Sequence, residues 1–376
     1  MNNTLNRIEE LERLRERYAR RNQEGQSRML DAFCEQYDYS RKPASKLLTD
    51  TLRPPTDRPP PGPAPKYLPV REVLAQVWRA AEQLCGKRLA PALPLWLPPC
   101  AKHFNPLLPA QKKLLAQISP ATIDRLLADG KAAPRGPRGP RPGPRPREQI
   151  PIAGEVWDER RPGFLEGDSV AHGGGSLAGD FIWSLTHTCL ASGWTEGRAV
   201  WNKGYQGVLT QTQDVEARLP FALRGRDVDN GGEGLNWQLV RDLPERPIPV
   251  QVTRSRPRHK DDNAHGEQKN WLWPRQLLGY QRLENSPAVQ PIRELYRDAW
   301  GPRRNFFLPS TKLVEKRREG GRLVRKHAEP QTAHQRLRAS GQLDAKTRRR
   351  LREQRASLDP FALAQTVASR LKKILN

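Results

Sequence analysis

Apolar and polar residues follow two different rhythms along the chain, and the change of rhythm divides it. Up to residue 130, apolar residues recur every three or four positions, which is the spacing of one face of an α-helix. From about residue 155, short apolar runs of strand length follow, separated by glycine-rich turns. The pattern therefore predicts helical regions first and a mixed α/β region after them.

The first region, residues 1–52, is predicted to be helical and to bind DNA. A charged helix is expected first, and two shorter helices joined by a tight turn are expected within residues 27–50. The outer side of the last helix carries the basic residues Arg41, Lys42 and Lys46. A short helix, a turn and a basic second helix outline a helix-turn-helix, whose second helix enters the major groove. An ordinary helical hairpin is the alternative interpretation.

Two linkers flank a second helical region. Residues 53–66 are rich in proline and are expected to be extended. Residues 67–130 have helical spacing at both ends, but the prolines within residues 89–109 predict an irregular segment between them. Residues 131–150 combine proline, glycine and arginine, so we expect an extended tether whose charges suit the DNA backbone.

The third region, residues 151–300, alternates predicted strands with predicted helices. Helices are expected over residues 205–219 and 235–243. The five strand-like runs are residues 164–171, 180–188, 194–200, 222–229 and 249–253. Short turns join the first three runs into an antiparallel meander, and helices connect the last two. This order is that of the ribonuclease-H-like fold, so we predict a mixed five-stranded sheet covered by helices.

Charge indicates the class of partner. The chain has 376 residues with a formal net charge of +24, and a soluble protein this basic typically binds nucleic acid. Its four cysteines lack the paired spacing of a zinc site. No secretory signal or apolar run of membrane-spanning length is present in the sequence, so we expect a cytoplasmic protein that does not bind membranes.

The last region, residues 301–376, is dense in lysine and arginine. Clusters of basic residues with few acids indicate an arm that contacts phosphates. A final amphipathic helix with apolar residues between 361 and 374 is expected to dock on the core or on another subunit.

Three carboxylates in the third region are placed as ligands of a divalent metal ion. Asp168 lies in a predicted strand, Asp229 lies where a later strand runs into a loop, and Glu267 lies at the start of a predicted helix. Hard oxygen ligands from separate elements suit Mg²⁺ or Mn²⁺ beside a phosphate. The sequence therefore predicts a phosphoryl-transfer site.

The blocks around these carboxylates resemble those of the integrase-type DDE transposases of bacterial insertion sequences, whose catalytic core is shared with retroviral integrases. The blocks are Glu-Gly-Asp-Ser-Val-Ala-His at 166–172, Asp-Val-Asp-Asn-Gly-Gly-Glu at 227–233 and Asp-Asn-Ala-His-Gly-Glu-Gln-Lys-Asn at 262–270. The resemblance covers about residues 155–330 and includes the segments 254–257 and 305–310.

The resemblance implies DNA end cleavage and strand transfer during transposition, which is a form of DNA integration and recombination. Asp168, Asp229 and Glu267 would be catalytic and would hold two Mg²⁺ or Mn²⁺ ions. The implied partners are the terminal inverted repeats and target DNA, bound by a homo-oligomer at the bacterial nucleoid. Asn230 would support the metal ligands, and the expected DNA contacts are Arg254, Arg256, Lys269 and Asn270.

Two other hypotheses remain open. Gly167, Gly266 and Pro274 soften the strand and the helix that carry the carboxylates. This favours a DNA-binding protein with a decayed, inactive integrase core. A remote alternative is a serine esterase, although the other sequence blocks of that family are absent, and its triad would be Ser169, His265 and Asp262.

Overall fold

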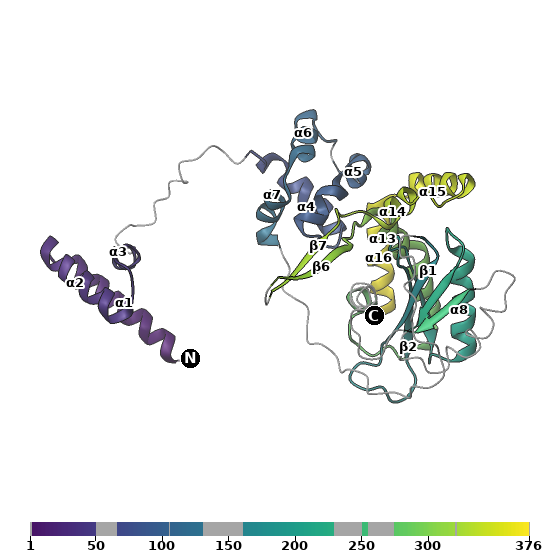
Figure 1. Cartoon of the computed structure of the whole chain (residues 1–376), viewed down its shortest axis with the longest axis horizontal. Coiled ribbons are helices and arrows are strands. Elements are labelled where there is room, and N and C mark those ends of the chain that lie inside the picture. The colour runs from purple at the N-terminus through teal and green to yellow at the C-terminus, as the bar shows by residue number, and fades with distance from the viewer. Residues whose placement is uncertain are drawn as a thin grey trace. The chain divides into compact units, whose positions relative to one another are not determined.

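The structure is a computed structural model that describes residues 2–49, 66–104, 106–130, 161–228, 250–254, 274–319 and 322–375. These residues belong to two compact units, Met1–Lys66 and Tyr67–Asn376, which we describe one at a time (Figure 1). None of the helices in the described residues combines the length and apolarity that crossing a membrane requires.

The first unit contains three helices. They are α1 (Asn2–Ala19), α2 (Gln23–Tyr37) and α3 (Arg41–Thr49). The helix α2 ends at Tyr37, and the left-handed backbone of its C-cap Asp38 (φ 54°) turns the chain toward α3. The predicted pair of helices with a tight turn is therefore present. A small apolar core holds the three helices together, formed by Tyr18, Leu30, Phe33, Ala44 and Leu48.

The second unit begins with a helical block. Its elements are η1 (Leu68–Val70), α4 (Arg71–Ala80), α5 (Gly86–His103), α6 (Pro109–Gln117), α7 (Pro120–Leu126) and η2 (Ala128–Gly130). The sequence predicted a separate helical domain over residues 67–130. In the structure its apolar side chains share one hydrophobic core with helices after residue 276, so the block is part of the second unit.

The helix α5 corrects the expectation of an irregular segment within residues 89–109. It runs to His103 despite four internal prolines, Pro91, Pro94, Pro98 and Pro99. Each internal proline costs roughly 3 kcal/mol, but burying a large apolar side chain contributes roughly 1.5–3 kcal/mol. One face of α5 is buried along its length, through Leu89, Ala92, Leu93, Trp96 and Cys100. Tertiary packing therefore outweighs the local preference.

The described strands after residue 160 form a mixed sheet. They are β1 (Phe164–Ala171), β2 (Ile182–Cys189), β3 (Thr195–Trp201), β4 (Gly225–Val228) and β5 (Gln251–Arg254). Their order is β3-β2-β1-β4-β5. Neighbours from β3 to β1 are antiparallel, and neighbours from β1 to β5 are parallel. The predicted mixed α/β architecture behind N-terminal helices is confirmed.

Helices cover both faces of the sheet. The helix α8 (Tyr205–Arg218) packs Val208 against Leu185 and Val200. The opposite face is covered by α12 (Val289–Glu294), the π-helical turn η5 (Leu295–Trp300) and α13 (Gly301–Phe307). The approach of η5 is close, because a Cβ added at Gly197 of β3 would lie 3.1 Å from the Tyr296 ring.

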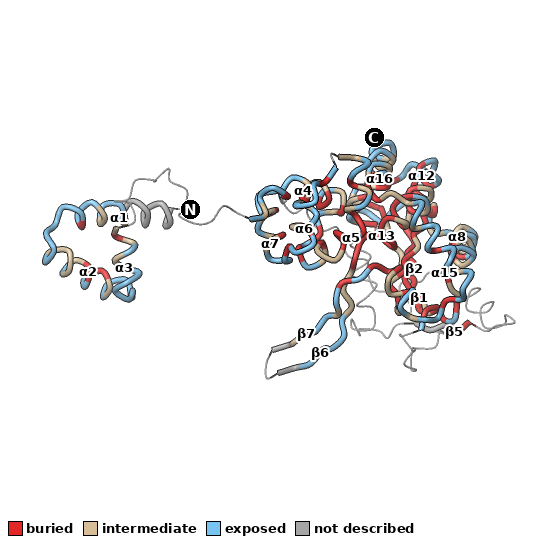
Figure 2. Tube along the Cα trace, turned by 90° about the horizontal axis from the view of Figure 1, so that it is seen from above, coloured by how far each residue is buried: buried red, intermediate tan, exposed pale blue. Residues whose placement is uncertain are grey.

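The C-terminal part combines a hairpin with three helices. After α11 (Gln276–Leu278) and η4 (Ser286–Ala288), the later elements are β6 (Leu313–Glu319), β7 (Arg322–His327), α14 (Ala333–Ala339), α15 (Ala345–Ser357) and α16 (Pro360–Leu375). The β6–β7 hairpin projects from the body in both views (Figures 1 and 2). The final helix docks on this chain's own core, where Phe361 meets Trp96 edge to face at 5.2 Å.

A buried ion-pair cluster ties the helical block to α13. The Glu82 carboxylate follows α4 in a left-handed turn (φ 60°) and accepts hydrogen bonds from Arg303 (2.7 Å), Trp300 (3.1 Å) and Arg304. Burial acts to raise the pKa of Glu82, but Arg304, Arg303 and the Trp300 N–H together hold it below its usual value. Two arginines at the start of the predicted phosphate-binding arm, Arg303 and Arg304, are therefore buried structural residues.

Replacing Glu82 by glutamine is expected to lower the unfolding free energy at neutral pH by about 3–5 kcal/mol, because two buried guanidinium groups lose their counter-charge. Because the folded pKa of Glu82 is lowered, its contribution is complete above the unfolded value of about 4.3 and is lost as the pH falls through the folded value. Urea unfolding of both proteins between pH 7 and pH 3 measures the difference, which should shrink in acid.

The matched control is Glu72→Gln, which removes an exposed carboxylate 3.8 Å from Arg79. An exposed pair contributes little, so this variant should unfold like the parent protein. Equal unfolding of the Glu82 and Glu72 variants at pH 7 would contradict the role of the cluster.

Candidate functional site

Asp168 lies in β1, the central strand of the sheet. Its backbone is in register with Thr186 of β2, and its side chain is half-buried. The Ser169 backbone N–H donates to Asp168 Oδ1 at 2.5 Å, which fixes one carboxylate oxygen against its own strand. The first predicted metal ligand is thus held on a well-paired strand.

Two further carboxylates share the face of Asp168. Glu166 precedes it by two residues, and Asp227 of β4 is in parallel register with Glu166. Side chains alternate along a strand, so these three point to the same side of the sheet. Both Glu166 and Asp227 are buried. Within the part of the chain that the structure describes, no group of three or more His, Cys, Asp or Glu side chains is arranged to hold a metal ion.

The other site residues predicted in the α/β region have little or no described structure. Six lie outside the described residues, namely Asp229, Asn230, Arg256, Glu267, Lys269 and Asn270. Only the backbone of Arg254 is described, in register with Val228 at the end of β5. The structure therefore positions Asp168 and the strand ends beside it, and the assembly of the predicted triad stays a prediction.

The structure places Ser169, the nucleophile of the esterase hypothesis, within a strand. In the structure β1 continues through Ser169 to Ala171, and Ser169 is paired with Leu185 of β2. The other two residues of that triad, Asp262 and His265, lie outside the described residues.

Gly167 lies beside a buried arginine of β4. A Cβ added at Gly167 would lie 3.5 Å from Nη2 of Arg226, whose guanidinium also approaches His187 Nδ1 at 3.1 Å. Burial, followed by the charges of Arg226 and Arg198, holds the pKa of His187 well below its usual value. The imidazole is therefore neutral and accepts the arginine N–H.

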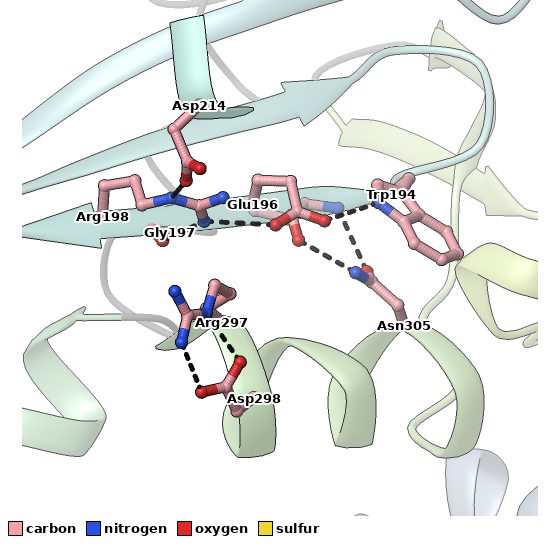
Figure 3. Close-up of polar contacts among 9 residues, drawn as sticks. Trp194, Glu196, Gly197, Arg198, Asp214, Arg297, Asp298 and Asn305 are labelled. Atoms are coloured by element: carbon pink, nitrogen blue, oxygen red, sulfur yellow. Dashed lines mark hydrogen bonds and ion pairs between the residues drawn. The ribbon is translucent and has the colours of Figure 1, made fainter. Parts of the chain in front are cut away.

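A second buried arginine joins β3 to α8. The Arg198 guanidinium donates to Asp214 Oδ2 at 2.6 Å and to Glu196 Oε2 at 3.2 Å, while Trp194 Nε1 donates to Glu196 Oε1 at 3.0 Å (Figure 3). Burial raises the pKa of Glu196, and Arg198 partly opposes that shift. These contacts fix the outer antiparallel strand against the helix that covers it.

Asn305 belongs to a segment that the family resemblance included, and it joins α13 to β3. Its side chain accepts from the Thr195 N–H at 3.0 Å and donates to the Thr195 carbonyl at 2.9 Å (Figure 3). The amide thus continues the hydrogen bonding of β3 at the start of the strand. These two hydrogen bonds attach α13 to the first residue of β3.

A buried chain of hydrogen bonds, which the sequence pattern does not predict, follows β1 directly. His172 Nε2 lies 2.8 Å from Ser184 Oγ, which lies 2.8 Å from the Tyr296 hydroxyl. Burial, with a smaller effect of Arg275, lowers the pKa of His172 to about 3. The only local sign of these hydrogen bonds in the sequence is Ser184, a polar residue within the apolar run of β2, because Tyr296 is far from it in the sequence.

The three predicted DNA contacts of α3 divide into two kinds. Arg41 is ion-paired with Asp31 of α2 and donates to Ser27 Oγ at 2.5 Å, so it braces the two helices. Lys42 and Lys46 are exposed, and no described residue pairs with them. Being four residues apart, they lie on one side of α3.

Fold and site together define a basic, mixed α/β protein with a carboxylate on the central strand of its sheet. No family model matches the chain. The chain is 36% identical over 332 residues to an uncharacterized protein, y4rM, of Sinorhizobium fredii (strain NBRC 101917 / NGR234). The alignment covers 86% of this chain and 93% of that protein. The chain therefore belongs to the same family as y4rM.

Replacing His172 by asparagine is expected to make stability less dependent on pH. The unfolded chain takes up a proton near pH 6.5, whereas folded His172 does so near pH 3. Protonation therefore favours unfolding, and the unfolding free energy falls by about 1.4 kcal/mol per pH unit across that window for this one group. Urea unfolding between pH 7 and pH 4.5 should show a shallower slope in the variant.

The control variant is His327→Asn at an exposed position of β7. It should keep the slope of the parent protein. A slope that is the same in all three proteins would show that His172 can bind its proton in the folded state.

Proposed function

We propose that this protein is an integrase-type DDE transposase with a ribonuclease-H-like core, which cuts DNA ends and transfers strands with divalent metal ions. The observation that carries the proposal is the position of Asp168. It lies on the central strand, beside a parallel strand that leads directly into the Asp-Val-Asp-Asn block at residues 227–230.

The strand order supports the proposed core. Three strands joined in sequence are antiparallel, and the next strand returns to the other side of β1 and runs parallel to it. This is the arrangement expected when a meander is followed by strands that helices connect. It brings the last described residue of β4 beside Gly167 in the middle of β1, next to Asp168, so a ligand set from two strands can form there.

The register supports the pairing of the two aspartates. Parallel partners run from Phe164 with Gly225 to Gly167 with Val228 without a shift. Asp168 follows Gly167, and Asp229 follows Val228. The described pairing of β1 with β4 thus reaches the residue that precedes each aspartate.

The donor set suits Mg²⁺ or Mn²⁺, because Asp168, Asp229 and Glu267 offer hard carboxylate oxygens and include no thiolate or imidazole. Two such ions, when bound, supply the activation of a nucleophilic oxygen and the stabilisation of the leaving oxygen. The strand β1 would hold the Asp168 carboxylate in place. Glu267 would complete the ligand set from a different element. The net charge of +24 would draw the DNA phosphates toward the protein.

A DNA-binding protein with a decayed core is the second candidate. The chain's charge and the exposed Lys42 and Lys46 favour DNA binding whether or not the core cuts. Of the residues that motivate decay, Gly167 lies within β1, where an added Cβ would make ordinary contact with Arg226. Gly266 lies outside the described residues, and Pro274 begins a described helical turn that continues to Leu278.

We expect Asp168→Asn, Asp229→Asn and Glu267→Gln each to abolish metal-dependent cleavage and joining, because each removes a negative ligand. Affinity for the same DNA should be unchanged or slightly higher, since each substitution removes a charge that repels phosphate. The assay uses a labelled duplex containing an end of the DNA element that encodes the protein, with Mg²⁺ or Mn²⁺, and compares nicking and strand transfer with binding.

The matched control is Asp180→Asn, which neutralises an exposed acid between β1 and β2. It should cleave like the parent protein. If the parent binds DNA but never cleaves it with either metal, the decayed core is the correct description. Cleavage that survives in the Asp229 and Glu267 variants would refute the ligand assignment.

Substituting Lys42 and Lys46 by glutamine is expected to weaken DNA binding and its dependence on salt. If both contact phosphates, the slope of log affinity against log salt should fall by about 1.8, from 0.9 for each contact. Fluorescence anisotropy with a duplex at several salt concentrations measures this slope. Arg20→Gln with Arg21→Gln removes the same charge from exposed positions between α1 and α2, and it should leave the slope nearly unchanged if α3 is the contact.

A further inference from the structure

The helix α15 (Ala345–Ser357) carries much more charge than its packing requires. Its sequence holds six basic residues and one acid, and Leu351 is its only buried residue. The side chain of Asp344 caps its start by accepting from the Thr347 N–H at 2.8 Å. Figure 2 shows the helix as mostly exposed, and in Figure 1 it extends outward beside α14. One leucine and a cap hold it, so most of its surface is available to solvent.

Three of its arginines form a row. Arg348, Arg352 and Arg355 are spaced by four and three residues, so they lie along one side of the helix about 6 and 4.5 Å apart. Arg348 and Arg352 are exposed, and Arg355 is half-buried. None of the three forms an ion pair within the described residues, whereas Arg349 is paired with Glu353 at 2.7 Å.

A fourth exposed arginine, Arg338, lies in the last turn of α14. Buried His334, whose ring packs on Phe306 at 5.0 Å, has its pKa lowered to about 4 by burial and then by the charges of Arg338 and Arg355. Both cations therefore lie close to the same group. We call Arg338, Arg348, Arg352 and Arg355 the arginine patch.

The arginine patch is unfavourable for the isolated protein. Like charges four residues apart repel each other along a helix, and Arg348 lies in the first turns of α15, where the helix dipole disfavours cations. None of Arg348, Arg352 and Arg355 forms an ion pair with an acid among the described residues. A bound polyanion would relieve it.

We propose that the arginine patch binds the phosphate backbone of duplex DNA without regard to sequence, as a surface separate from the carboxylates of the sheet. The choice of DNA as the polyanion rests on the proposed function. Guanidinium groups bind phosphate through paired N–H donors. The patch contributes no exposed apolar side chain, which a membrane or a protein partner would require.

The test measures how the affinity for duplex DNA depends on salt. The full chain and its Arg348→Gln/Arg352→Gln/Arg355→Gln variant are titrated onto a labelled duplex of random sequence, in chelator and at several salt concentrations. Each lost phosphate contact lowers the slope of log affinity against log salt by about 0.9. The expected decrease is therefore about 2.7. The corresponding triple lysine variant should keep most of the slope, because it retains the charges.

The control removes the same charge elsewhere. Lys102, Lys112 and Lys113 are exposed in the helical block and have no acidic partner among the described residues. Their change to glutamine should leave the slope close to that of the parent protein. Circular dichroism and thermal unfolding of each variant confirm folding, since glutamine and arginine have similar helix propensity.

Three outcomes would overturn the proposal. They are an unchanged slope in the arginine variant, equal decreases in the arginine and lysine-block variants, and arginine-dependent binding to vesicles of anionic lipid without any to DNA. Because no metal is present, the result is independent of cleavage. A protein that binds through the patch but never cuts would support this inference while refuting the proposed catalytic activity.

Discussion

The second unit depends on one half-buried carboxylate. Glu82 holds two arginines and a tryptophan of η5 and α13, and those helices in turn pack on the sheet. A buried charge with a missing partner is costly, so the helical block and the helices that cover the sheet are constrained to stay together. Asn305 of α13 then extends the connection to β3 through both backbone groups of Thr195. The position of the outer antiparallel strand thus follows from contacts that begin in the helical block.

The sheet uses the same principle on both of its faces. Arg226 and Arg198 fill the face toward α8 with paired guanidinium groups, and Ser184 with Tyr296 and His172 forms a hydrogen-bonded relay on the other. Buried polar groups stabilise a fold only when they are paired, and their directional bonds then allow few alternative arrangements. Asp168 lies between these two sets of contacts, so the strand that carries it has little freedom to shift its register.

The sequence predicted the elements better than their partners. The run at residues 164–171 coincides with β1 because strand alternation and a following glycine turn are local signals. The prolines of α5 gave a wrong prediction of irregular structure, because proline disfavours a helix locally whereas burial of one helix face stabilises this helix. Arg303 and Arg304 were placed in a basic arm because a charge run does not reveal that Glu82, more than two hundred residues earlier, neutralises it. The proposed ligands Asp229 and Glu267 lie outside the described residues, so the sequence blocks carry that part of the site.

Arginine therefore has two roles here, and the difference between them is physical. Arg303 and Arg304 are buried against a carboxylate, so neutralising either should affect folding first. The arginines in the row on α15 are exposed or half-buried and have no such partner among the described residues, so they contribute little to folding. A chain with a net charge of +24 cannot pair all of its cations internally. The unpaired ones are where a polyanion gains the most by binding, because each contact releases counterions from the nucleic acid without breaking an existing ion pair.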